Sequence, residues 1–168
     1  MEHESNIDWE FEGEYLVYDR WTWYRNHFQA CADSAAVDFV VLANDVAWLL
    51  EAKDFTTTPP DRQKEPLHEI VARKARDTLA GLFAGAISAG DARQPFAQEV
   101  LGARKLRVVF HCELPTNKHP LFPPKLTLSD LKQKLRNAVK AVDPHALVVD
   151  CRTPAADAPW TATWNPHP

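Results

Sequence analysis

Two carboxylates and a lysine stand close together in the segment AVDFVVLANDVAWLLEAKDF: they are Asp38, Glu51 and Lys53. Two apolar runs in this segment flank Asn44-Asp45, a pair typical of a two-residue type I′ hairpin turn. Counting outward from this turn places Asp38 directly opposite Glu51, where paired Cβ atoms lie about 4.5–5.5 Å apart. Because side chains alternate along a strand, Lys53 is expected on the same face as Glu51.

This predicted cluster is suited to binding a divalent cation. Opposed carboxylates repel each other in a sheet, and Mg²⁺ relieves such repulsion because it binds carboxylate, water and phosphate oxygens. The alternative is that Lys53 neutralises one acid and that the group forms a solvated end of a sheet. The run 46–50 is apolar on both strand faces, which is typical of a covered strand and favours buried acids.

Asp38, twelve intervening residues and then Glu51-Ala52-Lys53 resemble the signature of the PD-(D/E)XK nuclease superfamily, which has the restriction-endonuclease-like fold. The signature covers about residues 36–55, and a compatible order of elements extends to about residue 150. Val37 stands where the superfamily name has proline. The resemblance implies Mg²⁺ bound by Asp38, Glu51 and the backbone carbonyl of Ala52, with Mn²⁺ able to substitute. It also implies that Lys53 orients or activates the attacking water.

The resembling family often adds an acid from the element that precedes the hairpin. Glu14 is our candidate for this further metal ligand, with Glu12 and Asp19 as alternatives. Nothing in the spacing selects among the three, and each also suits an acidic surface strand.

Four basic residues after the hairpin are candidate contacts to nucleic acid. Arg62 and Lys64 lie in a loop rich in Thr and Pro, and Arg73 and Lys74 lie on the first turns of the following helix. Lys74 is closest to the apolar face of that helix, so it either reaches a substrate phosphate or extends along the core edge into water.

Hydrophobic periodicity predicts the elements that must position these residues. The order is a strand region, the hairpin, a helix, a strand, a helix and a strand, which indicates an α/β three-layer sandwich with a central mixed sheet. The aromatic segment 9–28 is expected to form core rather than a base-stacking surface. The strand region is 9–21, interrupted by Gly13, and a short helix is possible at 21–30. Helices are expected at 67–88 and from a cap at Thr127 or Ser129 to about residue 142. Strands are expected at 106–114 and 146–151, and 90–102 is expected to be irregular or partly helical.

We predict three parts: a flexible acidic N-terminus at 1–8, a nuclease-like domain at 9–152 and an extended tail rich in Pro and Trp at 153–168. Trp160 and Trp164 are expected to pin the tail to the domain, to a second protomer or to a partner protein.

Composition fits one globular domain, since the 168 residues are 45% hydrophobic and 25% charged. No apolar run is long enough for a membrane span, and the acidic start lacks a signal peptide's apolar region. Three widely spaced cysteines indicate reduced thiols and a cytoplasmic location. Zinc is not expected, because no close Cys/His pairing repeats, and the neighbours His111 and Cys112 point to opposite strand faces.

The net charge of −4 is unevenly distributed. Residues 1–19 hold seven acids and no Lys or Arg, whereas residues 60–140 hold fifteen Lys and Arg against eight Asp and Glu. A basic stretch is suited to phosphate contact, although a solvated surface with an acidic end explains it equally well.

The sequence therefore predicts a Mg²⁺-dependent nuclease that hydrolyses phosphodiester bonds, most of all in DNA. No phosphate-loop, dinucleotide-binding, esterase or zinc-protease motif is present. The alternatives are a non-catalytic nucleic-acid-binding or assembly module on the same fold, and an unrelated interaction protein in which the match is accidental.

Overall fold

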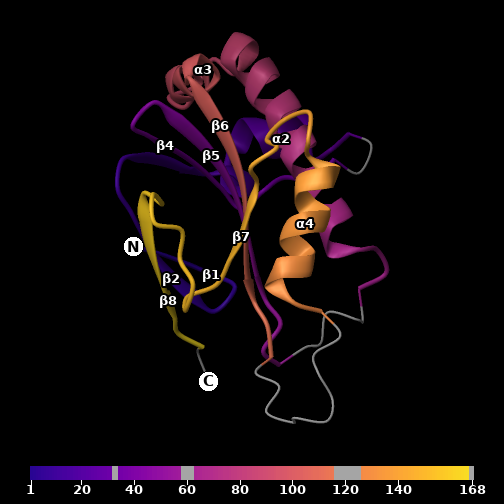
Figure 1. The fold of residues 1–168 in the computed structure, drawn as a ribbon. Coiled ribbons are helices and arrows are strands. Elements are labelled where there is room, and N and C mark those ends of the chain that lie inside the picture. Colours follow the sequence, from indigo (N-terminus) through magenta and orange to yellow (C-terminus); the bar gives the residue numbers. More distant parts are fainter. Residues whose placement is uncertain (32–33, 58–62, 116–125, 167–168) are drawn as a thin grey trace, which may run out of the picture.

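The computed structural model describes residues 1–31, 34–57, 63–115 and 126–166 (Figure 1). A five-stranded mixed sheet forms its centre, with the strand order β3-β4-β5-β6-β7. β3, β4 and β5 are antiparallel neighbours, whereas β5, β6 and β7 run parallel. The bounds are Glu14–Val17 for β3, Phe39–Ala43 for β4, Val46–Asp54 for β5, Lys105–Glu113 for β6 and Leu147–Val149 for β7.

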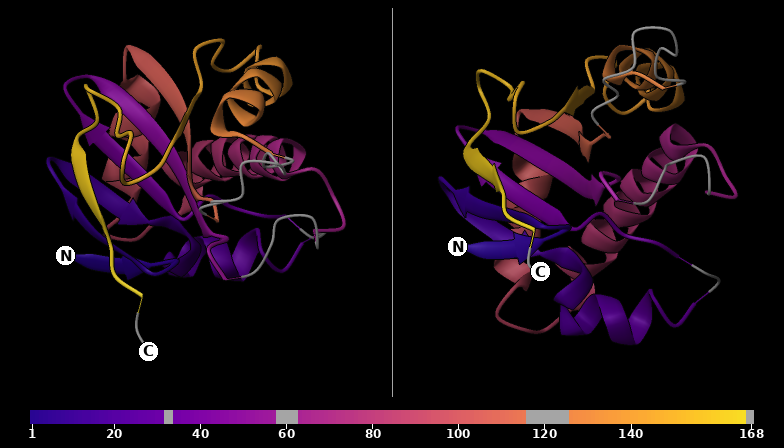
Figure 2. Two further views of the ribbon diagram at one scale, coloured as in Figure 1. Left: turned by 60° about the horizontal axis from the view of Figure 1, so that its bottom comes forward. Right: turned by 90° about the horizontal axis from the view of Figure 1, so that it is seen from below.

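The helices cover one face of this sheet (Figures 1 and 2). Their apolar side chains form one core with alternate strand residues such as Val40, Leu49 and Phe110. The predicted helix 67–88 and its bounds are confirmed, and the irregular segment contains a helix. The helices are η1 at Tyr18–Arg20, α1 at Thr22–His27, α2 at Leu67–Ser88, α3 at Gln94–Gly102 and α4 at Leu128–Ala138.

α4 begins as predicted, because the hydroxyl of Thr127 accepts a hydrogen bond from the amide of Asp130. It ends at Ala138 instead of residue 142. The turn that follows is held by Asp143, whose carboxylate accepts a hydrogen bond from the amide of Val108 at 2.9 Å.

A second, three-stranded sheet covers the other face and makes the third layer. Its strands are β1 (Glu2–Glu4), β2 (Ile7–Phe11) and β8 (Trp160–Trp164), in the order β1-β2-β8. The coarse expectation of a three-layer α/β fold with a central mixed sheet is therefore met, with all helices on one side.

Segments near the two chain ends, 2–11 and 160–164, belong to this third layer, which corrects the prediction of a flexible N-terminus. Ile7 and Trp9 are fully buried, so the first strands are part of the core. Trp160 packs edge-on against Trp48, with the ring centroids 5.3 Å apart, and so holds the C-terminal segment against its own domain. Trp164 is still half-exposed.

The aromatic segment before the hairpin forms core, as predicted, and explains two glycines inside α2. Tyr18 and Trp21 are buried against this helix. A Cβ on Gly81 would collide with the Tyr18 hydroxyl, and one on Gly85 would collide with the Trp21 ring. The glycines thus allow α2 to lie close to the segment that precedes the hairpin.

The predicted hairpin register is confirmed. Ala43 pairs with Val46 and Phe39 pairs with Leu50. Asn44 and Asp45 have φ of 51° and 64°, as a type I′ turn requires. One further step along the register places Asp38 opposite Glu51.

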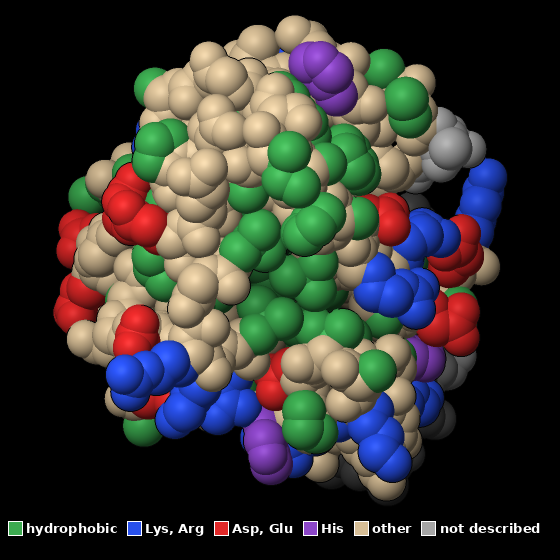
Figure 3. Space-filling view, turned by 90° about the horizontal axis from the view of Figure 1, so that it is seen from above, with side chains coloured by type: hydrophobic (Ala, Val, Ile, Leu, Met, Phe, Trp, Pro, Cys, Tyr) green, Lys and Arg blue, Asp and Glu red, His purple; other side chains and the backbone are tan. Residues whose placement is uncertain are grey.

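Apolar side chains remain exposed at the end of the molecule where α2 terminates. Phe83 and Ile87 of α2 and Leu101 of α3 are exposed, and hydrophobic side chains gather near the centre of the face seen from this end (Figure 3). No helix among the described residues is long and apolar enough to cross a membrane.

Candidate functional site

Asp38, Glu51 and Lys53 meet at one end of the central sheet, on its helix-covered face. The exposed fraction is 7% for Asp38 and 1% for Glu51. Asp38 Oδ2 accepts a hydrogen bond from the amide of Ala52 at 2.7 Å, and Lys53 Nζ lies 3.3 Å from Glu51 Oε1. The structure therefore brings together the three residues that the hairpin register predicted.

Lys74 is the fourth member of this cluster, and α2 positions it. Its Nζ lies 2.6 and 2.7 Å from the two carboxylate oxygens of Glu51 and 4.0 Å from Asp38 Oδ1. The sequence indicated that Lys74 lies near the apolar face of α2 but did not predict its partner. Two acids and two ammonium groups therefore share one partly closed site.

The electrostatics of the site favour protonation of Glu51. Burial and the nearby Asp38 carboxylate raise the pKa of Glu51 to about 7, although Lys74 and Lys53 oppose this shift. Burial alone would lower the pKa of Lys53, but the charges of Glu51 and Asp38 outweigh it and raise that pKa. Lys53 is therefore a persistent cation, and Glu51 can take up a proton near neutral pH.

Asp19 and Glu4 are the acids that approach this cluster from the elements before the hairpin. Burial raises the pKa of each, and the second cause in both is the charge of Asp38. The amide of Tyr18 donates to the backbone carbonyl of Asp38 at 2.9 Å, which places η1 and therefore Asp19 beside the site.

Glu14, our first candidate for the further acid, does not reach the cluster. It pairs with Leu42, four residues along β4 from Asp38, a separation of about 14 Å at the usual rise of a strand. Glu12 is exposed and precedes β3. Asp19, the remaining alternative, is the one that the structure brings near. The sequence did not select it because η1 replaces the continuous strand expected there.

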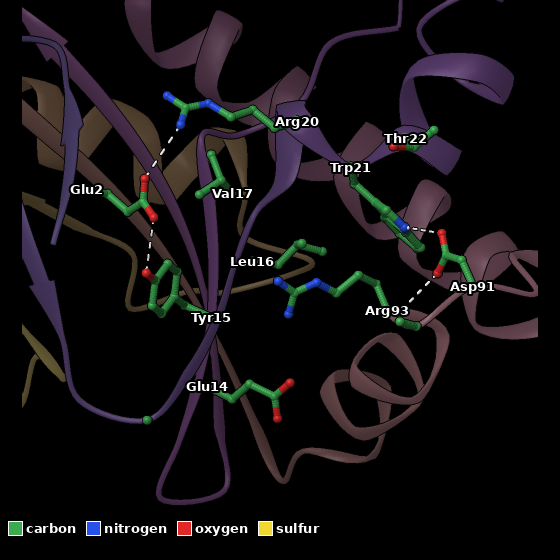
Figure 4. Close-up of a pocket in the computed structure, with 12 residues that line it drawn as sticks. Glu2, Glu14, Tyr15, Leu16, Val17, Arg20, Trp21, Thr22, Asp91 and Arg93 are labelled. Atoms are coloured by element: carbon green, nitrogen blue, oxygen red, sulfur yellow. Dashed lines mark hydrogen bonds and ion pairs between the residues drawn. The ribbon is translucent and has the colours of Figure 1, made fainter.

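Glu14 instead lines a cleft of about 700 Å³ along the free edge of β3 (Figure 4). Arg93 extends toward the strand in this cleft, and the indole nitrogen of Trp21 donates to Asp91 at 2.8 Å. None of the four clustered residues lines the cleft. It is therefore a separate feature beside the candidate site.

The other predicted nucleic-acid contacts lie away from the cluster or outside the described residues. Arg73 is exposed and its guanidinium pairs with Glu65 at 2.7 Å. Lys64 is exposed, and Arg62 lies outside the described residues. Of the four basic candidates, Lys74 is the one that the structure places at the acids.

The oxygen atoms of the cluster suit a hard divalent cation. Asp38 and Glu51 supply carboxylates, and Ala52, whose carbonyl is the further expected ligand, follows Glu51 and donates its amide to Asp38. This carbonyl accepts a hydrogen bond from the Ser5 hydroxyl at 3.0 Å, a contact that the sequence did not indicate. Mg²⁺ prefers such ligands, but a cation must compete with Lys74 for the oxygens of Glu51.

Comparison with known proteins gives limited information. No family model and no solved structure matches the chain significantly. The chain is 25% identical to a cysteine–tRNA ligase of Neisseria meningitidis over an alignment of 170 residues, gaps included. This match covers 82% of the chain and 24% of the ligase, so the chain spans about a quarter of the length of that relative.

Proposed function

We propose that this protein is a Mg²⁺-dependent nuclease that hydrolyses phosphodiester bonds in DNA, on a restriction-endonuclease-like fold. One observation carries the proposal: two buried carboxylates and a lysine converge across a hairpin at the end of a mixed sheet. Burying two carboxylates side by side is costly, and such groups cluster at functional sites more often than elsewhere.

In this proposal Asp38, Glu51 and the Ala52 carbonyl hold the cation. Mg²⁺ or Mn²⁺ bound there supplies a Lewis acid for the scissile phosphate and a lower pKa for a bound water. Lys53 is charged and 39% exposed, so it can position that water and offset the charge that develops on phosphate oxygens. Lys74 keeps Glu51 in place before the cation binds and is then free to contact a phosphate.

The test is cleavage of labelled single- and double-stranded DNA in Mg²⁺ or Mn²⁺ by Asp38→Asn and Lys53→Met variants. Asparagine keeps the size of Asp38 and an oxygen that accepts from Ala52. We expect each variant to lose at least about 100-fold in rate, as removal of one stabilising group commonly does. Undiminished cleavage by both variants contradicts the assignment.

Matched controls lie at the opposite end of the same sheet. Asp45→Asn changes an exposed acid in the hairpin turn that contacts Arg104 at 3.1 Å, and Lys105→Met changes an exposed lysine at the start of β6. Both variants should cleave at the wild-type rate. Because the name of the ligase relative contains tRNA, a structured RNA should be included among the substrates that are assayed.

A second candidate function is a non-catalytic nucleic-acid-binding or assembly module. The bidentate contact of Lys74 with Glu51 favours it, because this contact balances the buried charge without a metal. Calorimetric titration with Mn²⁺ separates the two functions. A nuclease should bind Mn²⁺ in the wild type and lose this binding in Asp38→Asn, whereas a non-catalytic module should show no difference.

A further inference from the structure

A second cluster of polar side chains lies on the opposite face of the same sheet end. His111 Nε2 is 2.9 Å from Glu113 Oε1 and 3.6 Å from Cys151 Sγ. The three donor atoms lie within 4.8 Å of one another, and no other such group of three is found in the part of the chain that the structure describes.

Strand alternation and the parallel pairing of β6 with β7 build this cluster. His111 and Glu113 are two residues apart and therefore share a face of β6. His111 pairs with Val149, and two further residues along the chain bring Cys151 beside Glu113. The amide of Cys151 donates a hydrogen bond to Glu113 Oε1 at 2.6 Å. This bond holds the carboxylate close to the imidazole of His111 and the thiol of Cys151.

The geometry does not suit a nucleophile, base and acid acting in sequence. Such a triad needs the thiol and the carboxylate at different nitrogens of the imidazole, whereas both approach Nε2 here. His111 Nδ1 is buried and has no hydrogen-bond partner among the described residues. Nε2, the nitrogen that the carboxylate and the thiol share, is therefore the one that faces the other two side chains of this cluster.

We propose that His111, Glu113 and Cys151 bind a transition-metal ion, Zn²⁺ in the first place. One nitrogen, one oxygen and one sulfur form a borderline-soft donor set that suits Zn²⁺ and disfavours Mg²⁺. A tetrahedral zinc site with ordinary bond lengths has N–S and N–O edges of about 3.5 and about 3.3 Å. The observed N–S distance of 3.6 Å already fits, and the N–O distance of 2.9 Å needs only a small opening.

The surroundings hold His111 in place, and Cys151 is the ligand that solvent reaches. The His111 ring makes a T-shaped contact with buried Trp9 at 4.8 Å, which fixes its orientation. His111 and Glu113 are buried, whereas Cys151 is partly exposed, so a water or small ligand that completes the site would enter from the Cys151 side. Three protein ligands with an open position for water or a small ligand are the arrangement of catalytic zinc sites.

The test uses Co²⁺ alone as a spectroscopic probe, added to the 168-residue chain after it has been freed of metal. We expect one equivalent to bind with a thiolate-to-cobalt charge-transfer band, and Zn²⁺ to displace it. Cys151→Ser should lose the band and bind at least about 100-fold more weakly, since changing even the partners of ligands costs 10–100-fold. Cys31→Ser, which changes an exposed thiol elsewhere, should keep the band.

Glu113→Gln gives a second reading that does not depend on the thiol. Glutamine can still accept from the amide of Cys151, so the fold is preserved while the carboxylate is lost, and Co²⁺ affinity should fall at least about 10-fold. A folded wild type without a charge-transfer band, or a band that survives in Cys151→Ser, overturns the proposal. Asp38→Asn should retain the band, so this result does not depend on the nuclease assignment.

Discussion

Two clusters on opposite faces of one sheet end show how differently this fold treats a buried glutamate. Glu51 lies beside Asp38, and burial with this second carboxylate raises its pKa to about 7. Burial alone would also raise the pKa of Glu113, but hydrogen bonds from His111 and the Cys151 amide outweigh it and lower that pKa. Glu51 is therefore ready to take up a proton or exchange its counter-ion, whereas Glu113 is held as an anion.

The source of positive charge is the physical difference between the clusters. Asp38, Glu51, Lys53 and Lys74 form the cluster on the helix-covered face, called the helix-face cluster below. Its two lysines neutralise its two acids, and one of these lysines comes from α2. The second cluster faces the three-stranded sheet, and its own imidazole, that of His111, is the basic group paired with Glu113. Hard oxygen donors with movable ammonium groups suit Mg²⁺ and phosphate, whereas a mixed donor set of nitrogen, oxygen and sulfur suits a resident transition metal.

The largest expected effect is a crossed loss of two activities. Asp38→Asn should lower Mg²⁺-dependent cleavage about 1,000-fold, an effect of about 4 kcal/mol in the transition state, and leave Co²⁺ binding intact. Cys151→Ser should do the reverse. The two readouts are cleavage rate and the charge-transfer band in the same preparations. Loss of both by either variant would show that the two clusters form one coupled site.

The next largest expected effect is a pH dependence of the free energy of unfolding that is caused by the titration of Glu51. Its pKa is higher in the folded chain than its ordinary 4.5, so the folded state binds the proton more tightly. The contribution to stability is therefore greatest below pH 4.5, falls as pH rises toward 7, and is constant above. The difference from 4.5 to about 7 corresponds to about 3 kcal/mol.

Urea denaturation of the wild type and Glu51→Gln across pH 4 to 9, with a chelator present, checks this dependence. The variant removes the titrating group, so it should gain about 3 kcal/mol relative to the wild type between pH 4.5 and 7. Glu113→Gln is the matched comparison and should show no such gain, because the pKa of Glu113 is lowered. Parallel curves for the wild type and Glu51→Gln contradict the raised pKa.

The sequence predicted the helix-face cluster because a short hairpin carries most of it. An Asn-Asp turn sets the register, and strand alternation then decides which side chains share a face. Two of the four members lie on one strand and a third lies opposite, all within sixteen residues. The central layers could be predicted for a similar reason, because the hydrophobic periodicity within a long segment such as α2 is enough to predict its secondary structure.

The second cluster depends on long-range pairing, which local patterns do not encode. His111 and Glu113 share a strand face by alternation, but Cys151 joins them only through the parallel register of β6 and β7. The comparison of His111 with its neighbour Cys112 therefore did not lead to Cys151 as a neighbour of His111. Lys74 and Ser5 were missed as partners for the same reason, since each reaches the site from another layer.

A smaller effect separates the buried ion pair from a surface one on the same helix. Lys74→Met removes the ion-pair partner of buried Glu51 and should destabilise the fold by about 2 kcal/mol at pH 8. This is less than the usual loss for a broken buried ion pair, because Glu51 can take up a proton. The loss should shrink at pH 5, where Glu51 is protonated. Thermal or urea unfolding at the two pH values measures it.

Arg73→Met, one residue away, is the control for Lys74→Met. Arg73 pairs with Glu65 in solvent, and exposed pairs contribute about 0–1 kcal/mol. Added Mn²⁺ should restore Lys74→Met but not Arg73→Met, because the cation replaces the lost ammonium group beside Glu51. Equal losses in both variants at both pH values would mean that Glu51 does not rely on Lys74.

The smallest expected effect concerns Ser5, which lies in the turn between β1 and β2 and links the three-stranded sheet to the helix-face cluster. Its hydroxyl donates to the Ala52 carbonyl, the backbone oxygen assigned to the cation. Ser5→Ala should cost about 1 kcal/mol of stability without metal. It should also raise Mn²⁺ affinity by a factor of up to about 5, since the cation no longer competes with the hydroxyl.

Ser34→Ala removes a similar hydroxyl-to-carbonyl hydrogen bond, from Ser34 to Phe28 at 2.6 Å, away from the assigned ligands. It should cost comparable stability and leave Mn²⁺ affinity unchanged. The contrast therefore isolates the carbonyl of Ala52 from general effects of losing a hydroxyl. If both variants leave Mn²⁺ affinity unchanged while Asp38→Asn abolishes it, the cation is held by the carboxylates without the backbone oxygen. The helix-face cluster would then hold its cation with two protein ligands, one fewer than the three of the His111 cluster. This would explain why two lysines are needed to balance the charge of its acids.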